Sequence, residues 1–413
     1  MEHWIYLQLL LDYGCIKTRQ VIENIKDISA VPRMSDQELL KLGVPKSRVE
    51  KRSAVTLDKA REIYKQCVDN KILVIPYNHK NYPQKLKAMD NPPVVLYGVG
   101  NIPDFDNRLC IAVVGPREIS EYGSRAAFSL SARLALSGAL VISGGAVGGD
   151  FYAHNGAMSV SEPTVNVTGG GLLSGYLKKN KLLRKDILMG GGFLITEFLP
   201  DYVPKAKNAF FLRNRVIAGL SDAVAVIEAP EKSGTLITAH LALEQGKEVY
   251  ALVEGGAPIQ YAGCRSLLQD GAKPLTTPKE LLSDFPNYKV NFKRLDSISS
   301  KQMKNLYEEF LDKQKAIEES AAKKKTERKT AKFPRNKVLP KVSTPKKSVV
   351  TPAGLDPKTK IVFEAFGDSE VFADEIVLKT KLDTATVLTA LTMLEVKGLI
   401  EALPGSRYRL KID

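Results

Sequence analysis

Residues 109–117 read LCIAVVGPR, and residues 140–150 read LVISGGAVGGD. Each stretch is a short apolar run that ends in glycine, and similar runs recur at intervals of about 20 to 30 residues, the repeat length of βαβ units. Continuous apolar runs indicate strands that are buried on both faces. Because βαβ crossovers are right-handed, this rhythm predicts a doubly wound, mostly parallel α/β sheet with helices on both sides. The later runs are 164–167, 193–196, 223–227 and 248–253.

Other patterns flank this Rossmann-like sheet. Residues 1–75 have apolar residues at helical spacing, which predicts an all-helical domain of the SAM or helix-hairpin-helix type. Residues 76–286 hold a Pro- and Tyr-rich lead-in with a short strand at 94–97, followed by the Rossmann-like domain itself. Residues 287–355 combine a polar helix, at 292–320, with a Lys- and Pro-rich flexible linker.

The last 58 residues, 356–413, predict a winged helix made of three helices and a β-hairpin. Its third helix has no Lys or Arg over residues 384–396, whereas groove-reading helices normally carry Arg, Lys, Asn or Gln. This favours a module that binds protein, or one that touches DNA only through Arg407, Arg409 and Lys411 of the wing. The predicted elements are helices 357–366, 373–379 and 384–397 and strands 399–403 and 407–411.

The formal net charge of +14 is concentrated in one segment. Residues 321–350 contain eleven Lys or Arg and one acid, Glu327. This segment either adds salt-sensitive affinity for a polyanion or serves as a solubilising spacer, and the folded parts are not strongly basic. The four cysteines form no CxxC pair, which suits a reducing cytoplasm. No apolar run approaches the roughly 18 residues of a membrane span, so we expect a soluble cytoplasmic protein.

Glycine-rich loops follow several of the predicted strands. Open α/β sheets bind ligands at the carboxyl ends of their strands, and glycines let a phosphate approach main-chain N–H groups at a helix start. For the second loop, at 143–150, the alternative is that its glycines serve only turns and helix packing. The predicted binding residues in these loops are Gly115, Arg117, Ser143, Gly144, Gly145, Gly234 and Thr235.

A second candidate phosphate contact lies in the N-terminal region, where residues 42–48 read LGVPKSR. A helix N-terminus after such a turn offers free N–H groups to a phosphate. The alternative is an ordinary capped junction between two helices, because Gly and Pro commonly mark helix boundaries.

Residues 210–222 read FFLRNRVIAGLSD, with Arg213 and Arg215 on either side of Asn214 at the start of an apolar helix. Side chains at i and i+2 of a helix point to different sides. One arginine is therefore expected to face the ligand cleft and the other a structural carboxylate or carbonyl. Lys178 and the lysines beside it either line the same rim or form a solvated helix face.

Over residues 76–285 the chain resembles the DNA-processing protein A (DprA/Smf) family. Flanking helical and winged-helix domains are also usual in that family, so the resemblance covers most of the chain. The motifs that carry it are VGPR at 114–117, SGGAVGGD at 143–150, FLRNRVIAGLSD at 211–222, KSGTLITAHLALEQGKEV at 232–249 and GCRSLLQDGA at 263–272.

The resemblance implies a non-catalytic protein that binds incoming single-stranded DNA during natural transformation and loads the RecA recombinase onto it. It also implies a homodimer formed through the Rossmann-like domain. The implied DNA contacts are Arg117, the loop at 143–145, Lys178, and Asn214 with one neighbouring arginine.

Three positions depart from the family pattern. Pro116 stands where the family usually has Ser or Thr, which removes one hydroxyl donor to phosphate. Leu177 follows Tyr176 where a Tyr-Pro pair is expected, and Arg265 replaces an Asn. These departures bear most on the loop after the third strand.

The alternative function is a nucleotide-binding enzyme or sensor of the phosphoribohydrolase-like Rossmann type. Those enzymes use a PGGxGTxxE loop, and residues 230–238 read PEKSGTLIT. Thr238 stands where the glutamate belongs, and threonine cannot act as a general acid or base. The four histidines have no metal-ligand spacing, and His154 is expected to be structural. We therefore expect no catalytic residues, no cofactor and no metal.

Overall fold

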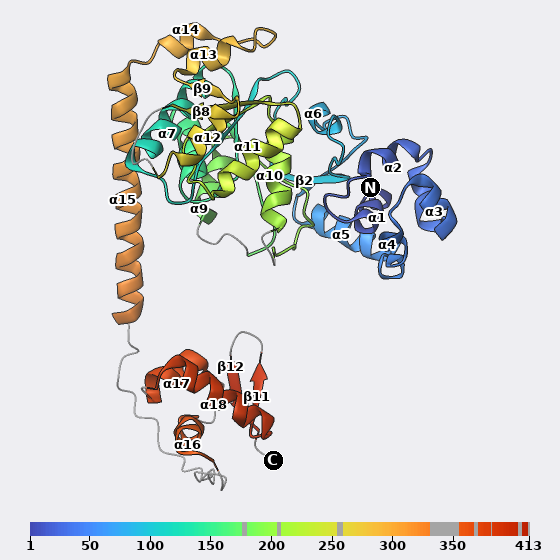
Figure 1. Cartoon of the computed structure of the whole chain (residues 1–413), viewed down its shortest axis with the longest axis vertical. Helices are drawn as coiled ribbons and strands as arrows, with labels where there is room; N and C mark the ends of the chain where they lie inside the picture. The colour runs from blue at the N-terminus through green and yellow to red at the C-terminus, as the bar shows by residue number, and fades with distance from the viewer. Residues whose placement is uncertain are drawn as a thin grey trace. The chain divides into compact units, whose positions relative to one another are not determined.

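The computed structural model describes residues 1–175, 180–204, 208–253, 259–330, 355–366, 371–380, 382–403 and 407–411. The chain forms two compact units, Met1–Arg328 and Lys329–Asp413, and each is described by itself (Figure 1).

A nine-stranded sheet organises the larger unit, in the order β1-β2-β6-β5-β4-β3-β7-β8-β9. Strands β3 to β9 are parallel to their neighbours, whereas β2 runs antiparallel to both β6 and β1. The predicted doubly wound, mostly parallel sheet is therefore confirmed. The strands are β1 (Leu73–Pro76), β2 (Val95–Gly100), β3 (Cys110–Val114), β4 (Leu140–Ser143), β5 (Thr164–Val167), β6 (Phe193–Thr196), β7 (Ala223–Val226), β8 (Glu248–Leu252) and β9 (Lys273–Leu275).

The sequence did not predict the outermost strands, β1 and β9. Both are short and contain a proline, Pro76 in β1 and Pro274 in β9, which argues against a central strand but is tolerated at a sheet edge. β1 also begins at Leu73, inside the region expected to be helical.

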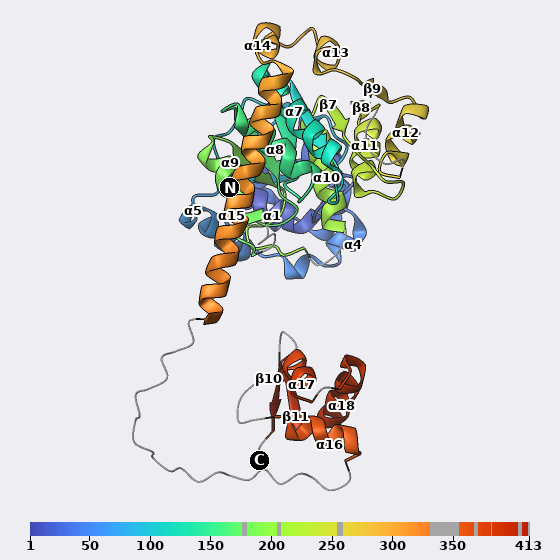
Figure 2. The same ribbon diagram turned by 90° about the vertical axis from the view of Figure 1, so that its left-hand side faces the viewer.

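Helices cover both faces of the sheet, as the two separate hydrophobic cores show (Figures 1 and 2). Cys110 and Ala112 of β3 pack in the core that contains α10, α11 and α12, whereas Ile111 and Val113 pack in the core that contains α7 and α8. This alternation follows from the period of two along a strand. The helices are α7 (Glu121–Leu136), α8 (Gly149–Ser159), α9 (Lys181–Met189), α10 (Asn208–Leu220), α11 (Gly234–Glu244) and α12 (Ala262–Gln269).

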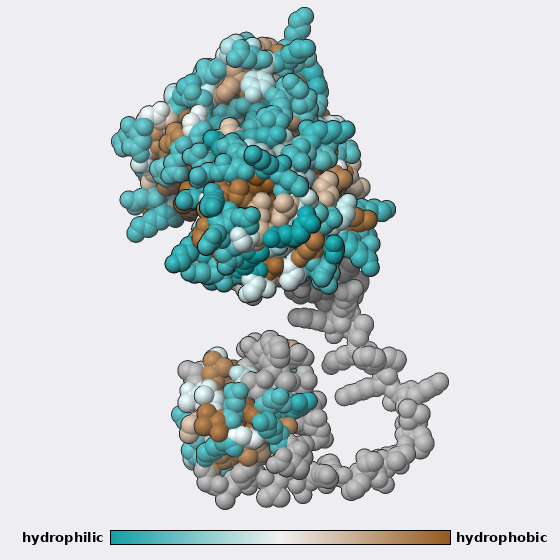
Figure 3. All heavy atoms as spheres, turned by 90° about the vertical axis from the view of Figure 1, so that its right-hand side faces the viewer, coloured by the Kyte–Doolittle hydropathy of each residue, from teal (hydrophilic) through white to brown (hydrophobic). Residues whose placement is uncertain are grey.

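The N-terminal region is helical, as predicted, and its core continues into the sheet. Tyr97 of β2 donates a hydrogen bond to Gln8 Oε1 (2.7 Å), and the Gln8 amide donates to the Glu197 carbonyl (2.6 Å). On the side shown in Figure 3 hydrophilic side chains dominate, because the apolar positions point inward. The elements are α1 (Glu2–Leu11), α2 (Thr18–Asn24), η1 (Ile28–Arg33), α3 (Asp36–Leu42), α4 (Lys46–Val49), η2 (Arg52–Ala54), α5 (Leu57–Asp69) and, after β1, α6 (Gln84–Lys87).

The turn at 42–48 has the geometry of a capped helix junction. Gly43 ends α3 in the left-handed conformation (φ 99°), and its N–H bonds the last turn of that helix. The following helix, α4, is only four residues long, and its Arg48 forms an ion pair with Asp12 (2.8 Å). These contacts support the structural alternative for this motif.

The polar helix expected at 292–320 is broken and longer than predicted. It consists of α14 (Phe292–Asp296) and α15 (Ser300–Thr330), after α13 (Pro278–Ser283). The Ser299 hydroxyl accepts a hydrogen bond from the Gln302 N–H, and the Gln302 side chain accepts one from the Ser299 N–H. This reciprocal pair caps the start of α15. α15 extends through 321–330, into the segment expected to be a flexible linker, because Ala, Lys, Glu and Arg are good helix formers. The remainder, 331–350, lies outside the described residues.

The smaller unit confirms the predicted winged helix. Its helices are α16 (Pro357–Glu364), α17 (Ala373–Thr380) and α18 (Thr384–Val396), and its strands are β10 (Val371–Phe372), β11 (Ile400–Leu403) and β12 (Arg407–Leu410). β12 lies between β10 and β11 in a three-stranded sheet, and the two-residue β10 was not predicted. The turn at 404–406 lies outside the described residues.

Candidate functional site

The strand order reverses at β3. From β3 the chain first builds outward through β4, β5 and β6, and then returns to add β7, β8 and β9 on the other side. The loops that leave β3 and β7 therefore diverge above neighbouring strands. Such a switch point at the carboxyl edge is where open α/β sheets bind their ligands.

A pocket of about 680 Å³ lies at this switch point. Six of the predicted binding residues line it, namely Gly115, Arg117, Arg213, Asn214, Gly234 and Thr235. Ser143, Gly144, Gly145 and Arg215 do not, and Lys178 lies outside the described residues. The other lining residues are Val114, Pro116, Ala146, Asp150, Asn208, Phe210, Phe211, Ile217, Ser233, Ile237 and Thr238.

Arg117 and Phe210 stand together at the mouth of the pocket. Arg117 is exposed, and its guanidinium carbon lies 5.4 Å from the centroid of the Phe210 ring, within cation–π range. Phe211, the next residue, is 48% exposed. An exposed guanidinium beside one aromatic ring, with a second aromatic residue in the same pocket lining, offers both charge for a phosphate and flat surfaces for a base.

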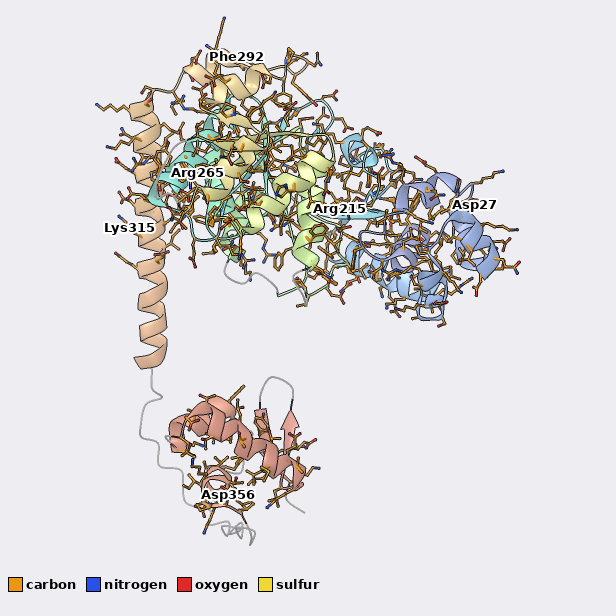
Figure 4. All side chains as sticks on the ribbon, in the orientation of Figure 1. Asp27, Arg215, Arg265, Phe292, Lys315 and Asp356 are labelled. Carbon is orange, nitrogen blue, oxygen red and sulfur yellow. The ribbon has the colours of Figure 1, made fainter. Side chains whose placement is uncertain are left out.

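The two arginines of α10 separate as predicted. Figure 4 labels Arg215 on this helix. Arg213 lines the pocket and donates to the Val167 carbonyl (3.2 Å). Arg215, one of the candidate binding residues, is the arginine that meets a structural carboxylate: it is buried in an ion pair with Glu197 and donates to the Asn91 carbonyl. Arg215 thus fixes α10 against the lead-in segment, and only Arg213 faces the cleft.

Asp150 lies on the pocket wall beside Arg213. Burial raises the pKa of the Asp150 carboxyl, and the positive charge of Arg213 opposes that shift. The carboxyl also accepts a hydrogen bond from the Ala146 N–H (3.3 Å). Asp150 therefore supports the second loop and partly balances the charge of Arg213.

In the loop after β4, packing accounts for the first two glycines. A Cβ on Gly144 would lie 1.5 Å from Nη1 of Arg213, and one on Gly145 would lie 1.9 Å from Nδ2 of Asn166. Gly145 also has a left-handed φ of 67°. The hydroxyl of Ser143 is buried and donates to the Val113 carbonyl (2.7 Å), so it faces the sheet.

The second pair of glycines in this loop lets the first loop approach. Gly148 has φ 83°, and a Cβ there would lie 2.2 Å from the Pro116 carbonyl oxygen. At Gly149, a Cβ would lie 2.4 Å from the Cα of Gly115. These contacts support the alternative in which the glycines serve turns and packing, and they shape the pocket indirectly.

A buried polar layer supports the same loop from below. His154 is fully buried, bonds Thr164 Oγ1 (2.9 Å) and meets Asn166 Nδ2 (3.3 Å), which confirms its structural role. Burial, helped by the charge of Arg213, lowers the pKa of His154 to about 3, so the ring is neutral. The Asn180 amide donates to the Gly145 carbonyl (2.5 Å) and ties the start of α9 to the loop.

The start of α11 is more open. Ser233 is the N-cap and accepts a hydrogen bond from the Thr235 N–H (3.2 Å). A Cβ on Gly234 would meet no atom within 4 Å. Packing therefore does not require glycine at position 234, whereas a ligand that approaches the helix N-terminus would.

Sequence reasoning missed three residues that shape the site. Phe210 was part of a quoted motif but was given no role. Asn166 interrupts an apolar strand, which was a usable signal of a buried polar role. Glu228 follows β7, is fully buried, and accepts hydrogen bonds from the Ser120 N–H (3.0 Å) and the Tyr261 hydroxyl (3.1 Å). It thereby links the loops that follow β3, β7 and β8.

Two negative observations apply to the described part of the chain. No group of three or more His, Cys, Asp or Glu side chains there is placed to hold a metal ion. No helix among those residues combines the length and the apolar character needed to cross a bilayer.

Comparison with known proteins identifies both units. The family described as DNA recombination-mediator protein A matches residues 73–286, and the DprA winged helix domain matches residues 346–406. The DNA processing protein DprA of Bacillus subtilis is 35% identical over 222 residues, which cover 54% of this chain and 74% of that protein. Protein Smf of Synechocystis is 30% identical over 340 residues, covering 80% and 78%.

A solved structure agrees with these sequence relatives. The X-ray structure of DNA processing protein A from Streptococcus pneumoniae superposes with a TM-score of 0.57 at 27% identity, covering 68% of this chain and 97% of that one. The chain therefore belongs to the DNA recombination-mediator protein A (DprA/Smf) family.

Proposed function

We propose that this chain binds single-stranded DNA in the pocket at the switch point and helps to load RecA onto that strand, in natural transformation and DNA recombination. The observation that carries the proposal is the pairing of Arg117 with Phe210 at the pocket mouth, next to the open start of α11. Single strands are held by phosphate contacts together with base stacking, and these groups supply both.

The shape of the site favours a single strand over a duplex. The aromatic rings of Phe210 and Phe211 line a concave pocket. A duplex keeps its bases stacked inside, where Phe210 and Phe211 cannot reach them. The membership of a recombination-mediator family and the relatives named as DNA processing proteins support DNA as the ligand. RecA as the partner is what the family resemblance implies.

Two further parts of the proposal rest on the family. We infer a homodimer formed through the Rossmann-like domain and a role without catalysis. Thr238 lines the pocket where related phosphoribohydrolases carry their glutamate, and a hydroxyl cannot serve as a general acid or base at neutral pH.

The alternative is a nucleotide-binding enzyme or sensor, favoured by the pocket volume, which is within the range of small-molecule sites. A binding assay combined with a hydrolysis assay separates the two functions. We expect a 20-nucleotide single strand to bind at least about tenfold more tightly than the matching duplex, with no hydrolysis of nucleoside monophosphates. Turnover of nucleotides without a preference for single strands would contradict the proposal.

RecA loading needs its own test. RecA ATP hydrolysis is measured on a strand already covered by a single-strand-binding protein, with and without this chain. We expect the chain to shorten the lag before hydrolysis begins. An unchanged lag, together with intact DNA binding, would limit the function to DNA binding alone.

A further inference from the structure

The N-terminal helices bind the loop that follows β6, and that loop in turn holds α10. The buried Gln8 amide of α1 donates a hydrogen bond to the Glu197 carbonyl (2.6 Å). The Tyr13 hydroxyl, just after α1, accepts one from the Leu199 N–H (3.2 Å). On the other side of the same loop, the Glu197 carboxylate forms the buried ion pair with Arg215 of α10. These contacts connect α1 to α10 through residues 197–199.

The turn after α1 also packs directly on α10. Gly14 has a left-handed φ of 66°, and a Cβ there would lie 2.3 Å from Leu212 Cδ2. Leu212 stands between Phe211 and Arg213, which both line the pocket. The N-terminal region therefore contacts α10 at the part of that helix that forms the pocket wall.

A third connection passes through the short segment after α6. Arg19 of α2 donates a hydrogen bond to the Met89 carbonyl (3.0 Å), and Arg215 of α10 donates to the Asn91 carbonyl. A Cβ on Gly219 of α10 would lie 2.4 Å from Met89 Sδ, so the segment packs closely on that helix. The N-terminal helices thus reach α10 by three routes.

The ion pair at the centre of these contacts is incompletely satisfied. Glu197 and Arg215 are 3% and 2% exposed, and within the described residues Glu197 Oε1 and Arg215 Nε have no hydrogen-bond partner. A pair joined through one oxygen and one nitrogen fixes direction less well than a bidentate pair does. The backbone of the loop must therefore be held from elsewhere, and the bonds from Gln8 and Tyr13 hold it.

We propose that Gln8 and Tyr13 are positioning residues for strand binding. They fix the loop after β6, which orients α10 and with it Arg213, although neither of them lines the pocket. This inference rests on the proposed function and adds that strand affinity is set in part by the N-terminal helical region. By linkage, a bound strand must stabilise the contacts of α1 by the same free energy.

The test is the affinity of a double variant for a thymidylate 20-mer, measured by fluorescence anisotropy with the full-length chain. Gln8→Met removes the amide at similar volume, and Tyr13→Phe removes only the hydroxyl. We expect the double variant to bind about fivefold to tenfold more weakly, since each lost hydrogen bond is worth about a factor of five in an equilibrium constant and only part of that reaches α10. The single variants serve if the double variant does not fold, with about a two- to threefold loss each.

Two controls separate positioning from a merely structural role. Leu39→Ala removes a fully buried side chain of the same N-terminal core, on α3, which takes no part in these contacts. It should lower the free energy of unfolding but leave strand affinity within about twofold, and Leu39→Val serves in its place if needed. In an Arg213→Ala background, the double substitution should weaken binding by less than about twofold, because the side chain that α10 presents is already gone.

Each outcome decides between the possibilities. Unchanged affinity in a folded double variant overturns the positioning role and leaves DNA binding intact. Equal losses in the double variant and in Leu39→Ala also overturn it, because the stability of the N-terminal core would then be the cause. A full additional loss in the Arg213→Ala background overturns action through α10. Failure of the unmodified chain to bind the strand overturns the proposed function, and the positioning role with it.

Discussion

Two glycine-bearing loops lie at the carboxyl edge of the sheet, and glycine serves a different purpose in each. In the loop after β4, a Cβ added at any of the four glycines would lie too close to another part of the protein for a side chain to fit. These glycines are Gly144, Gly145, Gly148 and Gly149. After β7, Gly234 faces open space at the start of α11. The glycine-rich loop therefore builds the pocket wall, and the loop with a single glycine leaves room for the ligand.

The comparison shows that several glycines in one loop can all be required by packing. Many glycines are what close packing of backbones requires, and such packing leaves little room for anything else. One glycine with no steric reason at a helix N-terminus is a better indication of a bound anion.

The largest effect is expected from Gly149→Val. Its Cβ would lie 2.4 Å from Gly115 Cα, and neither backbone can move away without opening the pocket. We expect the free energy of unfolding to fall by more than about 4 kcal/mol. The measurement is urea unfolding followed by the fluorescence of Trp4, the single tryptophan of the chain, which packs against the core of the larger unit. A loss below about 1 kcal/mol would remove the packing explanation.

A somewhat smaller loss of stability is expected when the pH is lowered, because His154, which lies beneath the loop after β4, becomes protonated in the unfolded chain. The pKa of His154 is lowered to about 3 in the folded state, whereas the unfolded chain takes up a proton near pH 6.5. Its contribution to stability is therefore present above pH 6.5 and is lost as the pH falls toward 3. We expect the loss between pH 7 and pH 4 to be on the order of 3 kcal/mol.

His154→Gln keeps a polar side chain in the layer and removes the titration. The stability of this variant should depend less on pH over the same interval, as measured by urea unfolding at several pH values. If both proteins lose stability equally, His154 does not carry the effect.

Much of the fold was predictable from the sequence, whereas the site was predictable only in part. Strands β3 to β8 follow from continuous apolar runs, because burial on both faces leaves a clear signal. The short edge strands β1 and β9 leave no such signal. Arg117 and Asn214 were predicted as site residues because Arg117 comes soon after a strand and Asn214 was expected at the start of a helix. The helix α10 begins earlier, at Asn208, so Asn214 lies within it, and both residues line the pocket.

Other features of the site depend on the fold and could not be read from the sequence. The α10 pattern predicted that Arg213 and Arg215 would point to different sides but did not show which one faces the cleft. That depends on Glu197, which follows β6 and meets Arg215 only in the folded chain. The close approach of Gly144 to Arg213 likewise exists only in the folded chain and could not be predicted from the sequence.

A smaller effect, on binding alone, is expected from Gly234→Ala. The added Cβ meets no atom within 4 Å, so the free energy of unfolding should change by less than about 0.5 kcal/mol. Affinity for a single strand should fall about fivefold to tenfold, because the methyl group keeps a phosphate away from the helix N-terminus. The two measurements are urea unfolding and fluorescence anisotropy. Unchanged affinity would show that the phosphate does not bind at the start of α11. It would contradict the claim that the loop after β7 contacts the ligand whereas the loop after β4 does not.

The smallest effect is expected when residues 356–413 are removed. The helix α18 contains no Arg or Lys, so it offers no basic side chain to a groove. Affinity for a single strand should stay within about twofold of the full chain in anisotropy titrations at fixed salt. A large loss would show that the strand is held by both units and not mainly by the pocket.

The most direct test of the central claim is the affinity of Arg117→Ala for single-stranded DNA. Removal of this guanidinium takes away both a phosphate partner and the group that stands over Phe210, so we expect affinity to fall at least about tenfold. Arg61→Ala, at an exposed arginine of α5 paired with Asp58, is the matched control and should bind as the unmodified chain does. Equal affinities of the two variants would contradict the claim that the pocket at the switch point holds the strand.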